Sequence, residues 1–446
     1  MVRRLAGIIV LCCLFAMTAM AADDAVGAEA LQYWPQWRGP LASGVAPQAD
    51  PPVEWSETKN IRWKIPLPGA GHSTPIVWGN RIFLTAAIPY GQAVPPARLR
   101  ASGAHDNHLT VQPQEFVVLA VNRQNGKVLW QKTVHKELPL EGGHLTSSLA
   151  SNSPVTDGEH LFAFFGSRGL YAFDLDGNPQ WQKNLGEMQT KHAHGEGASP
   201  ALYGETLIVN WDHQGDSFVI AFDKTTGKER WKVPRDEVTS WATPIVVEHA
   251  GKPQLIISGT GRLRGYDLTS GKVIWQCGGL SSNIVASPVA ADGMAFAGSS
   301  YVKRALLAIN LKDAIGDITQ TNHVAWSRTR GAPYVPSLLL YGNTLYTLRH
   351  YQGILSRIDA KTGQDLAGPF RLPGIHNVYA SPVAAADRLY ITDRDGITLV
   401  INHEKKNTPT VLGQNKLDDA FSASAALAGG DLILRGHTFL YSIAVQ

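Results

Sequence analysis

A repeated segment is the feature that most constrains what this chain can fold into. The pattern Ala-x-Asp-x-x-x-Gly-x-x-x-Trp is clearest at Ala221, Asp223, Gly227 and Trp231. Less complete copies end at Trp130, Trp181, Trp275 and Trp326. Self-similarity at a fixed period identifies a repeat architecture, in which each repeat is one supersecondary unit.

A second marker, a small residue followed by proline, precedes each copy of the repeat. The markers are Thr74-Pro75, Ser153-Pro154, Ser199-Pro200, Thr243-Pro244, Ser287-Pro288, Val335-Pro336 and Ser381-Pro382, with a version lacking proline at Ser422 to Ser424. From the second marker onward the spacing is about 45 residues, the period of a propeller blade. The first spacing is much longer, which indicates one insertion.

Each repeat shows four short runs of alternating apolar residues separated by turns. In one repeat these runs lie near 201–203, 206–209, 218–223 and 231–233. Such runs predict four strands per repeat, and eight markers then predict an all-β, eight-bladed propeller with four-stranded blades.

The two ends of the chain predict how the ring closes. After Ser424 there is room for only two or three strands and no Trp-bearing outer strand, whereas an orphan strand carrying Trp63 precedes the first marker. We expect this N-terminal strand to complete the last blade, because a closed ring has no exposed edge strand.

Composition and the N-terminus indicate an exported globular protein. Hydrophobic residues make up 44% of the 446 residues, charged residues 17%, and 40 basic residues nearly balance 37 acidic ones, so no nucleic-acid partner is expected. Residues 1–21 have the basic start, apolar run and small-x-small end of a signal peptide too short to span a membrane. We therefore expect a periplasmic or cell-envelope protein with no transmembrane segment after cleavage. The remainder divides into an N-terminal extension at 22–52 and the propeller at 53–446, with an insertion at about 86–114 in the first blade.

The two faces of the expected disc differ in composition. Turns within the blades, such as Thr225-Thr226-Gly227, are short and typical of structural turns. The loops between blades and after each second strand carry residues that turn geometry does not explain. The candidate binding residues on this second face are His72, His144, Asn152, Arg168, His192, His194, Glu196, Asp212, His213, Trp241, Arg262, Arg264, Asn283, Tyr334, Arg349, Tyr379, Arg394 and Asp419. We expect an envelope protein or a small ligand to bind at the channel mouth, with the insertion as a candidate lid.

One short segment has the residue types of a metal site. If His192, His194 and Glu196 lie on an extended segment, their spacing of two puts them on one side, and two imidazoles with a carboxylate can hold zinc or iron. The alternative is that these side chains only form hydrogen bonds. No nucleotide-binding glycine motif is present in the sequence.

The repeat resembles the tryptophan-docking motif of pyrroloquinoline quinone (PQQ) propellers, a family that includes quinoprotein alcohol dehydrogenases and the assembly factor BamB. The runs WPQWRGP at 34–40 and HGEGASP at 194–200 are similar to those of a BamB-like exported subgroup. By this resemblance, outer-strand tryptophans pack between adjacent blades. They are Trp63, Trp130, Trp181, Trp231, Trp275 and Trp326.

The resemblance leaves two functions open. The first is a non-catalytic scaffold of the envelope that binds a ligand or a protein, with an exposed aromatic patch of Trp241, Tyr334, Tyr379 and Phe421 for a partner peptide. The second is a PQQ-dependent dehydrogenase of alcohols or sugars, with PQQ and calcium. Its quinone carboxylates would pair with Arg168, Arg262, Arg264 and Arg394. The adjacent cysteines of the dehydrogenase members are missing, because Cys277 is the only cysteine after residue 21.

Overall fold

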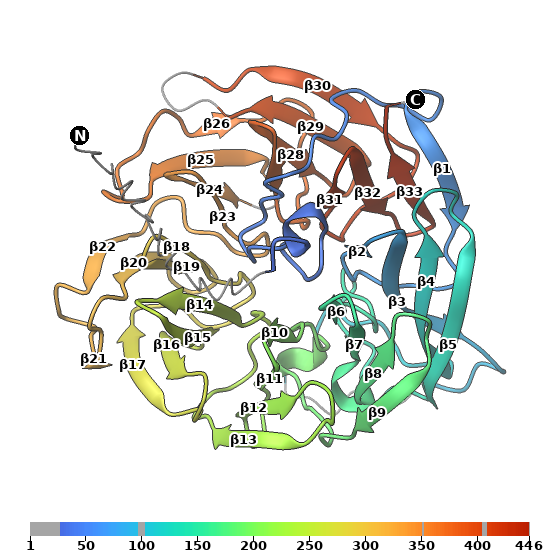
Figure 1. Ribbon diagram of the computed structural model, residues 1–446, viewed down its shortest axis with the longest axis horizontal. Coiled ribbons are helices and arrows are strands. Elements are labelled where there is room, and N and C mark those ends of the chain that lie inside the picture. The colour runs from blue at the N-terminus through green and yellow to red at the C-terminus, as the bar shows by residue number, and fades with distance from the viewer. Residues whose placement is uncertain (1–26, 97–102, 350–351, 404–407, 446) are drawn as a thin grey trace, which may run out of the picture.

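Eight β-sheets stand in a ring around a central channel (Figure 1). The computed structural model describes residues 27–96, 103–349, 352–403 and 408–445. The expected all-β, eight-bladed propeller is confirmed, whereas the expected signal peptide lies outside the described residues. Within the described ranges, no helix is long and apolar enough to cross a membrane.

Each blade is one sheet whose strands run outward from the channel in chain order, except that the N-terminal β1 is the outer strand of the last blade. The first four blades comprise β2 (Ile76–Trp78), β3 (Arg81–Pro89), β4 (Gln114–Asn122) and β5 (Val128–Glu137); β6 (Val155–Thr156), β7 (His160–Phe164), β8 (Leu170–Asp174) and β9 (Pro179–Lys183); β10 (Ala201–Tyr203), β11 (Thr206–Trp211), β12 (Phe218–Asp223) and β13 (Glu229–Pro234); and β14 (Ile245–His249), β15 (Lys252–Gly259), β16 (Arg262–Asp267) and β17 (Val273–Gly278).

The other four blades follow the same order. They comprise β18 (Val289–Ala291), β19 (Met294–Ser299), β20 (Ala305–Asn310) and β22 (Val324–Arg328); β23 (Leu339–Tyr341), β24 (Thr344–Arg349), β25 (Ile354–Asp359) and β26 (Phe370–Arg371); β27 (Val383–Ala385), β28 (Arg388–Thr392), β29 (Ile397–Asn402) and β30 (Val411–Lys416); and β31 (Ala426–Ala428), β32 (Asp431–Arg435), β33 (Phe439–Ile443) and β1 (Ile61–Pro66). Three single-turn 3-10 helices, η1 (Ala30–Gln32), η2 (Gly166–Arg168) and η3 (Lys191–Ala193), lie outside the sheets.

The core lies between the blades, because inner strands bury both faces and outer strands only one. Strand β12 is buried along nearly its whole length, whereas in β13 only Trp231 is fully buried. Apolar clusters therefore join neighbouring blades, as where Phe164 of one blade packs with Trp211 of the next. Sheets packed in this way leave no blade stable alone, which is the usual property of repeat proteins.

The N-terminal strand closes the ring as expected. Strand β1 pairs antiparallel with β33, and Trp63 stands opposite Ser442. One blade exceeds the expected four strands: the stretch between Asn310 and Trp326 forms β21 (Gly316–Asp317), which pairs with β17 of the preceding blade.

Five of the six outer-strand tryptophans hydrogen-bond to the next blade. In each case the indole N–H donates to a turn carbonyl, at Arg123, Leu175, Lys224, Leu268 or Ala360. Trp275 differs, because its indole donates to the side chain of Gln254 in its own blade. Gly265 permits this arrangement, since a Cβ there would lie 2.2 Å from the Trp275 nitrogen.

The small-residue markers form a hydrogen-bonded ring of hydroxyl groups around the channel. From the second marker on, each hydroxyl accepts from the backbone N–H of the preceding marker, at 2.8 to 3.0 Å, along the series Thr74, Ser153, Ser199, Thr243, Ser287, Ser337, Ser381 and Ser424. The sixth marker is thus Ser337 and not Val335, because valine has no hydroxyl to accept this bond. The series begins at Thr74, whose own hydroxyl is buried with no hydrogen-bond partner among the described residues.

The N-terminal extension, described from residue 27 to 52, fills one end of the channel, and we call it the plug. Its backbone pairs with three blades, where Trp34 bridges Val77, Pro35 accepts from Thr156, and Val45 bridges Ala384. Arg38 is buried and donates to the carbonyls of Ser43, Leu338 and Pro382. Figure 1 shows this blue segment in the middle of the ring.

The first-blade insertion is shorter than expected. Residues 86–89 continue β3 and Gln114 begins β4, because buried Ala86 and Ala87 extend the ladder opposite Val117 and Phe116. The insertion therefore spans 90–113, of which 97–102 lie outside the described residues. Its second half packs on the loop before β6, where Asn107 bridges His144.

Candidate functional site

A cavity of about 280 Å³ lies at the mouth of the channel, on the face that carries the loops between blades. We call this the loop face, and the opposite face, with the tight turns after each first strand, the turn face. All eight inter-blade loops contribute to the mouth cavity, and Trp37 of the N-terminal plug also lines it. The cavity brings together these predicted residues: His72, His144, His194, Glu196, Trp241, Asn283, Tyr334 and Tyr379.

Aromatic rings and hydroxyl groups share the wall of the mouth cavity. Trp241 is half-buried and anchored by its indole N–H, which donates to the carbonyl of Gly195 at 2.7 Å. Burial and the nearby Tyr301 and Tyr379 raise the pKa of Tyr334 to about 12, so its hydroxyl stays protonated at neutral pH. Five marker residues also line the cavity, namely Ser199, Thr243, Ser337, Ser381 and Ser424.

Histidines form one side of the mouth cavity. The rings of His144 and His194 meet edge to face at 4.7 Å, and His72 stacks on His437 at 5.1 Å. Burial, together with His144 and other histidines, lowers the pKa of His194 to about 4. Burial and the positive neighbours His437, Arg435, Arg394 and His108 lower the pKa of His72 to about 3. These imidazoles are therefore neutral at pH 7 and can donate or accept hydrogen bonds.

The expected one-sided arrangement of His192, His194 and Glu196 is wrong. This segment is not extended, because His192 has a positive φ of 57° within η3. Glu196 turns away and accepts from the hydroxyl and backbone N–H of Ser167, and it pairs with Arg168 at 3.1 Å. Within the described ranges, no three His, Cys, Asp or Glu side chains are grouped so as to hold a metal ion.

Two of the candidate binding residues belong to the buried framework. Asp212 is fully buried and accepts from both sides of the Arg235 guanidinium at 2.7 and 3.0 Å, and from the Ser240 hydroxyl at 2.6 Å. His213 is also buried, and its Nδ1 lies 3.2 Å from the backbone nitrogen of Gln189. Neither residue lines the mouth cavity.

The predicted basic residues are dispersed among ion pairs and side pockets. Arg168 pairs with Glu137 as well as Glu196. Arg262 and Arg264 pair with Asp236 and Glu237. Arg349 and Arg394 line two neighbouring pockets, and Arg394 lies 4.9 Å from the Tyr379 ring.

Two further predicted residues support the backbone. Asn152 donates to the carbonyl of Ala198, and Asp419 accepts from the backbone N–H groups of residues 437–439. Phe421, expected in an exposed patch, is fully buried and packs against Tyr441, so that expectation is wrong.

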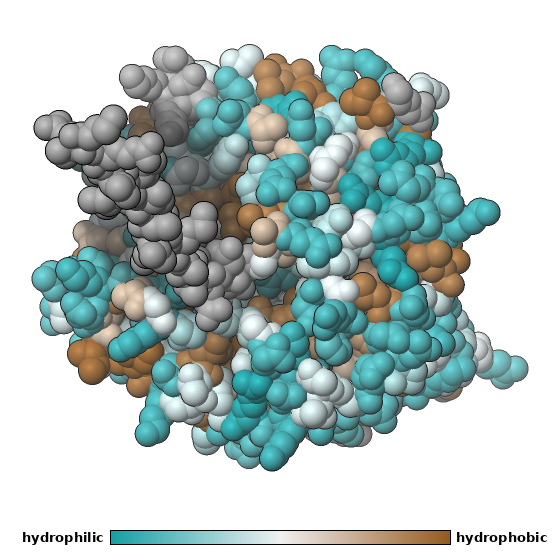
Figure 2. Space-filling model, in the orientation of Figure 1, coloured by the Kyte–Doolittle hydropathy of each residue, from teal (hydrophilic) through white to brown (hydrophobic). Residues whose placement is uncertain are grey.

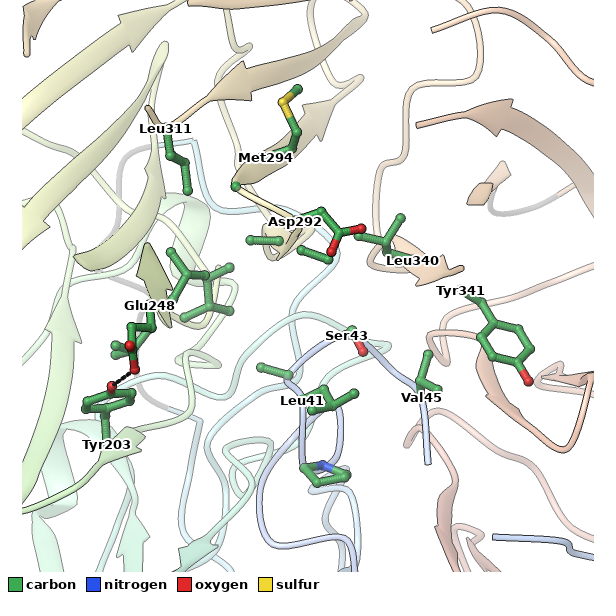
Figure 3. Close-up of a pocket in the computed structure, with 18 of the residues that line it drawn as sticks. Leu41, Ser43, Val45, Tyr203, Glu248, Asp292, Met294, Leu311, Leu340 and Tyr341 are labelled. Carbon is green, nitrogen blue, oxygen red and sulfur yellow. Dashed lines mark hydrogen bonds between the residues drawn. The ribbon is translucent and has the colours of Figure 1, made fainter. Parts of the chain in front are cut away.

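The turn face has a groove of about 450 Å³ beside the plug, which the sequence did not predict (Figure 3). In the close-up, Leu41, Ser43 and Val45 of the plug face Met294, Leu311 and Leu340 of two blades, and Tyr203 bonds to Glu248 at 3.1 Å. Figure 2 shows hydrophobic side chains in a hollow near the middle of a largely hydrophilic face. Apart from the Tyr203–Glu248 pair and Asp292, the groove is lined mainly by apolar groups.

Two sets of cavity residues were missed by the sequence-based prediction. Trp37 belongs to the run at 34–40, whose likeness to relatives was noted without assigning it a place in the fold. In the sequence-based prediction, the marker serines served only to count the repeats. Their recurrence before every first strand nevertheless places all of them at the channel.

Comparisons with known proteins agree with the propeller. The family model described as outer membrane protein assembly factor BamB, a PQQ-repeat model, matches residues 114–368. No curated protein matches the chain.

Solved structures with the same architecture include proteins of different function. BamB from Moraxella catarrhalis is 14% identical, over 81% of this chain and 99% of its own, with a TM-score of 0.52. A europium-containing methanol dehydrogenase is 10% identical, over 93% of this chain and 98% of its own, with a TM-score of 0.61. The quinohemoprotein alcohol dehydrogenase ADHIIG from Pseudomonas putida HK5 is 8% identical, over 93% and 80%, with a TM-score of 0.55. At such identities the similarity establishes a shared fold and no shared activity.

Proposed function

We propose that this protein is an exported propeller of the cell envelope that binds a small ligand without transforming it. The proposal starts from the family: the chain belongs to the PQQ-repeat family whose model is described as outer membrane protein assembly factor BamB. The observation that carries this proposal is the mouth cavity, where one loop from every blade converges on a recessed space of about 280 Å³. A concave site with aromatic walls and a few placed polar groups is the usual form of a small-molecule site.

The lining favours a ligand with both an apolar face and hydroxyl groups. Trp37, Trp241 and Tyr379 offer aromatic surface, while Asn283 and the marker hydroxyls offer hydrogen-bonding groups. A sugar ring presents C–H groups on its faces and hydroxyls around its edge, so it can pack on the aromatic rings while bonding to the rim. We therefore name a saccharide as the ligand class.

The same geometry gives less support to docking of a folded protein at this point. The aromatic side chains are recessed in a cavity, and the fourth member expected in the patch, Phe421, lies in the core. A protein partner would instead require a protruding or flat apolar surface.

The residues at the cavity do not fit PQQ with calcium. Calcium requires several oxygen ligands, but Glu196 is neutralised by Arg168 and the side-chain oxygen of Asn283 accepts from Lys191 at 2.7 Å. The carboxylates of the quinone require cations, yet no Arg or Lys is found among the described residues that line the cavity. We derive no redox step for this protein.

Calorimetric titration with neutral mono- and disaccharides of glucose, galactose and mannose tests the proposal. We expect at least one to bind, and Trp241→Ala to weaken binding about tenfold or more, because a buried aromatic anchor contributes on the order of 2 kcal/mol. Tyr203→Ala, on the turn face, is the matched control and keeps the affinity. Failure of the whole panel to bind, or equal affinity of the Trp241→Ala variant with an unchanged melting temperature, would contradict the proposal.

A further inference from the structure

A second cleft, of about 480 Å³, opens on the loop face between the blades of β18–β22 and β23–β26. Its wall combines the loop after β19, the end of β22 and the end of β24. Tyr334 lines both this cleft and the mouth cavity, so the two spaces are neighbours along one surface. The Tyr334 ring also stacks on Tyr301 at 5.8 Å.

Positive charge is concentrated in this cleft. Four arginines line it, namely Arg304, Arg328, Arg330 and Arg349, against one carboxylate, Asp365. That carboxylate is already paired with Arg328 at 2.5 Å. We call Arg304, Arg330 and Arg349 the arginine triad.

The arginine triad has no counter-ion within the described part of the chain. No ion pair joins Arg304, Arg330 or Arg349 to a described carboxylate, and the Arg349 guanidinium donates to the neutral side chain of Gln352 at 3.2 Å. The whole chain carries 40 basic and 37 acidic residues, so this excess is local and does not reflect a generally basic protein. Like charges in a concave site raise the local positive potential and attract anions.

The chemistry of the triad selects planar or tetrahedral oxyanions. A guanidinium offers parallel N–H donors that match a carboxylate or a sulfate, and Arg forms such bidentate bonds where Lys forms only point contacts. The hydroxyls of Ser300, Thr347 and Ser356 line the same cleft and can donate to further oxygens.

We propose that the arginine triad binds the acid group of a saccharide whose neighbouring sugar ring occupies the mouth cavity. The ligand class is therefore an acidic oligosaccharide that carries carboxylate or sulfate groups. This inference rests on the proposed function, because the adjoining aromatic and hydroxyl-lined cavity is what favours a sugar over another polyanion. A nucleic acid is the alternative that the test separates.

The first experiment measures the charge preference of the ligand. A galacturonate tetramer and a neutral galactose tetramer are titrated at low and physiological salt. We expect the acidic tetramer to bind about tenfold more tightly at low salt, with the preference shrinking as salt screens the cleft. An Arg304→Gln/Arg330→Gln double variant loses this preference and keeps its affinity for the neutral tetramer. The matched control is Lys361→Gln, an exposed cation of the β23–β26 blade on the turn face.

The second experiment tests the cleft without a saccharide. Sulfate is titrated while the side-chain N–H signals of arginine are followed by NMR, and we expect saturable shifts that the double variant lacks. The inference is overturned if sulfate produces no saturable shift, if the wild-type protein shows no preference for the acidic tetramer, if the double variant retains that preference, or if a single-stranded oligonucleotide binds more tightly than the acidic tetramer. If the neutral tetramer still binds in those cases, the proposed function stands while this inference falls.

Discussion

The two ends of the channel are built from the same eight repeats, yet they have become different surfaces. At the loop face, eight inter-blade loops leave a recessed cavity with Trp241 and the histidines on its wall. At the turn face, the segment around Trp34 and Arg38 fills the channel and leaves only a groove at its side. A single segment outside the repeats thus removes the equivalence of the two ends and turns an open channel into a pocket with Trp37 among its lining residues.

Buried arginines are held in two ways: some pair with carboxylates, whereas Arg38 of the plug and Arg435 near the loop face donate to uncharged groups. Behind the loop face, Arg235 is neutralised by Asp212 and Arg168 by two glutamates. In the plug, Arg38 donates only to carbonyl groups, and burial lowers its pKa to about 9, so it remains charged at neutral pH. Arg38 fastens the plug to two blades through its bonds to the carbonyls of Leu338 and Pro382. These carbonyl groups bind the guanidinium without cancelling its charge.

The largest loss in the free energy of unfolding is expected for a substitution in the plug. Trp34→Ala removes a fully buried indole that packs against Gly39, where a Cβ would lie 2.7 Å from the ring. We expect the free energy of unfolding to fall by about 3–5 kcal/mol, as for other buried aromatic truncations. Urea denaturation followed by tryptophan fluorescence and circular dichroism measures the loss.

The control for the plug lies three residues away. Trp37→Ala removes an indole that is only partly buried and lines the cavity, so we expect a smaller loss of stability together with weaker saccharide binding. Equal destabilisation by the two substitutions would show that the plug does not divide into a structural and a ligand-facing half.

The hydroxyl ring provides a smaller effect with a built-in control. Ser287→Ala leaves the buried backbone N–H of Thr243 without its acceptor, at present 2.8 Å away, and should cost about 1–3 kcal/mol. Thr74→Val removes a hydroxyl that has no partner among the described residues and keeps the side-chain shape. We expect that substitution to change stability by less than about 0.5 kcal/mol. Comparable losses in the two variants, measured by urea denaturation, would show that the ring bonds do not stabilise the fold.

A separate effect is expected in the pH dependence of the loop-face end. The pKa of His72 is lowered to about 3 and that of His194 to about 4 from 6.5, so the unfolded chain binds protons that the folded state does not. The free energy of unfolding is therefore highest above about pH 7 and falls as the pH drops from 6.5 toward 3. His72→Gln and His194→Gln should each flatten the plot of the urea midpoint against pH. An unchanged slope in both variants would assign the dependence to other groups.

The sequence alone determined the architecture, because repetition makes every local signal count several times. The period of about 45 residues, the alternating strands and the orphan strand with Trp63 predicted eight blades and the way in which they close. The outer-strand tryptophans follow one sequence pattern, yet Trp275 differs in its hydrogen bond: it bonds to Gln254 of its own blade, since Gly265 leaves room that an alanine would fill.

The site was only partly contained in the sequence. Position in the repeat placed His72, Trp241 and Tyr379 correctly at the channel mouth, because every inter-blade loop must end there. It did not reveal that Asp212 would be sequestered by Arg235, since that pairing depends on how two loops of one blade fold back on each other.

Tertiary structure decided which end of the channel is open. The plug contacts residues some 300 positions away, as where Arg38 donates to the carbonyls of Leu338 and Pro382. No local pattern encodes such contacts, because they exist only once the ring has brought distant blades together. Local periodicity therefore determines the blades, whereas the cavity and its charged neighbour arise from the closed ring.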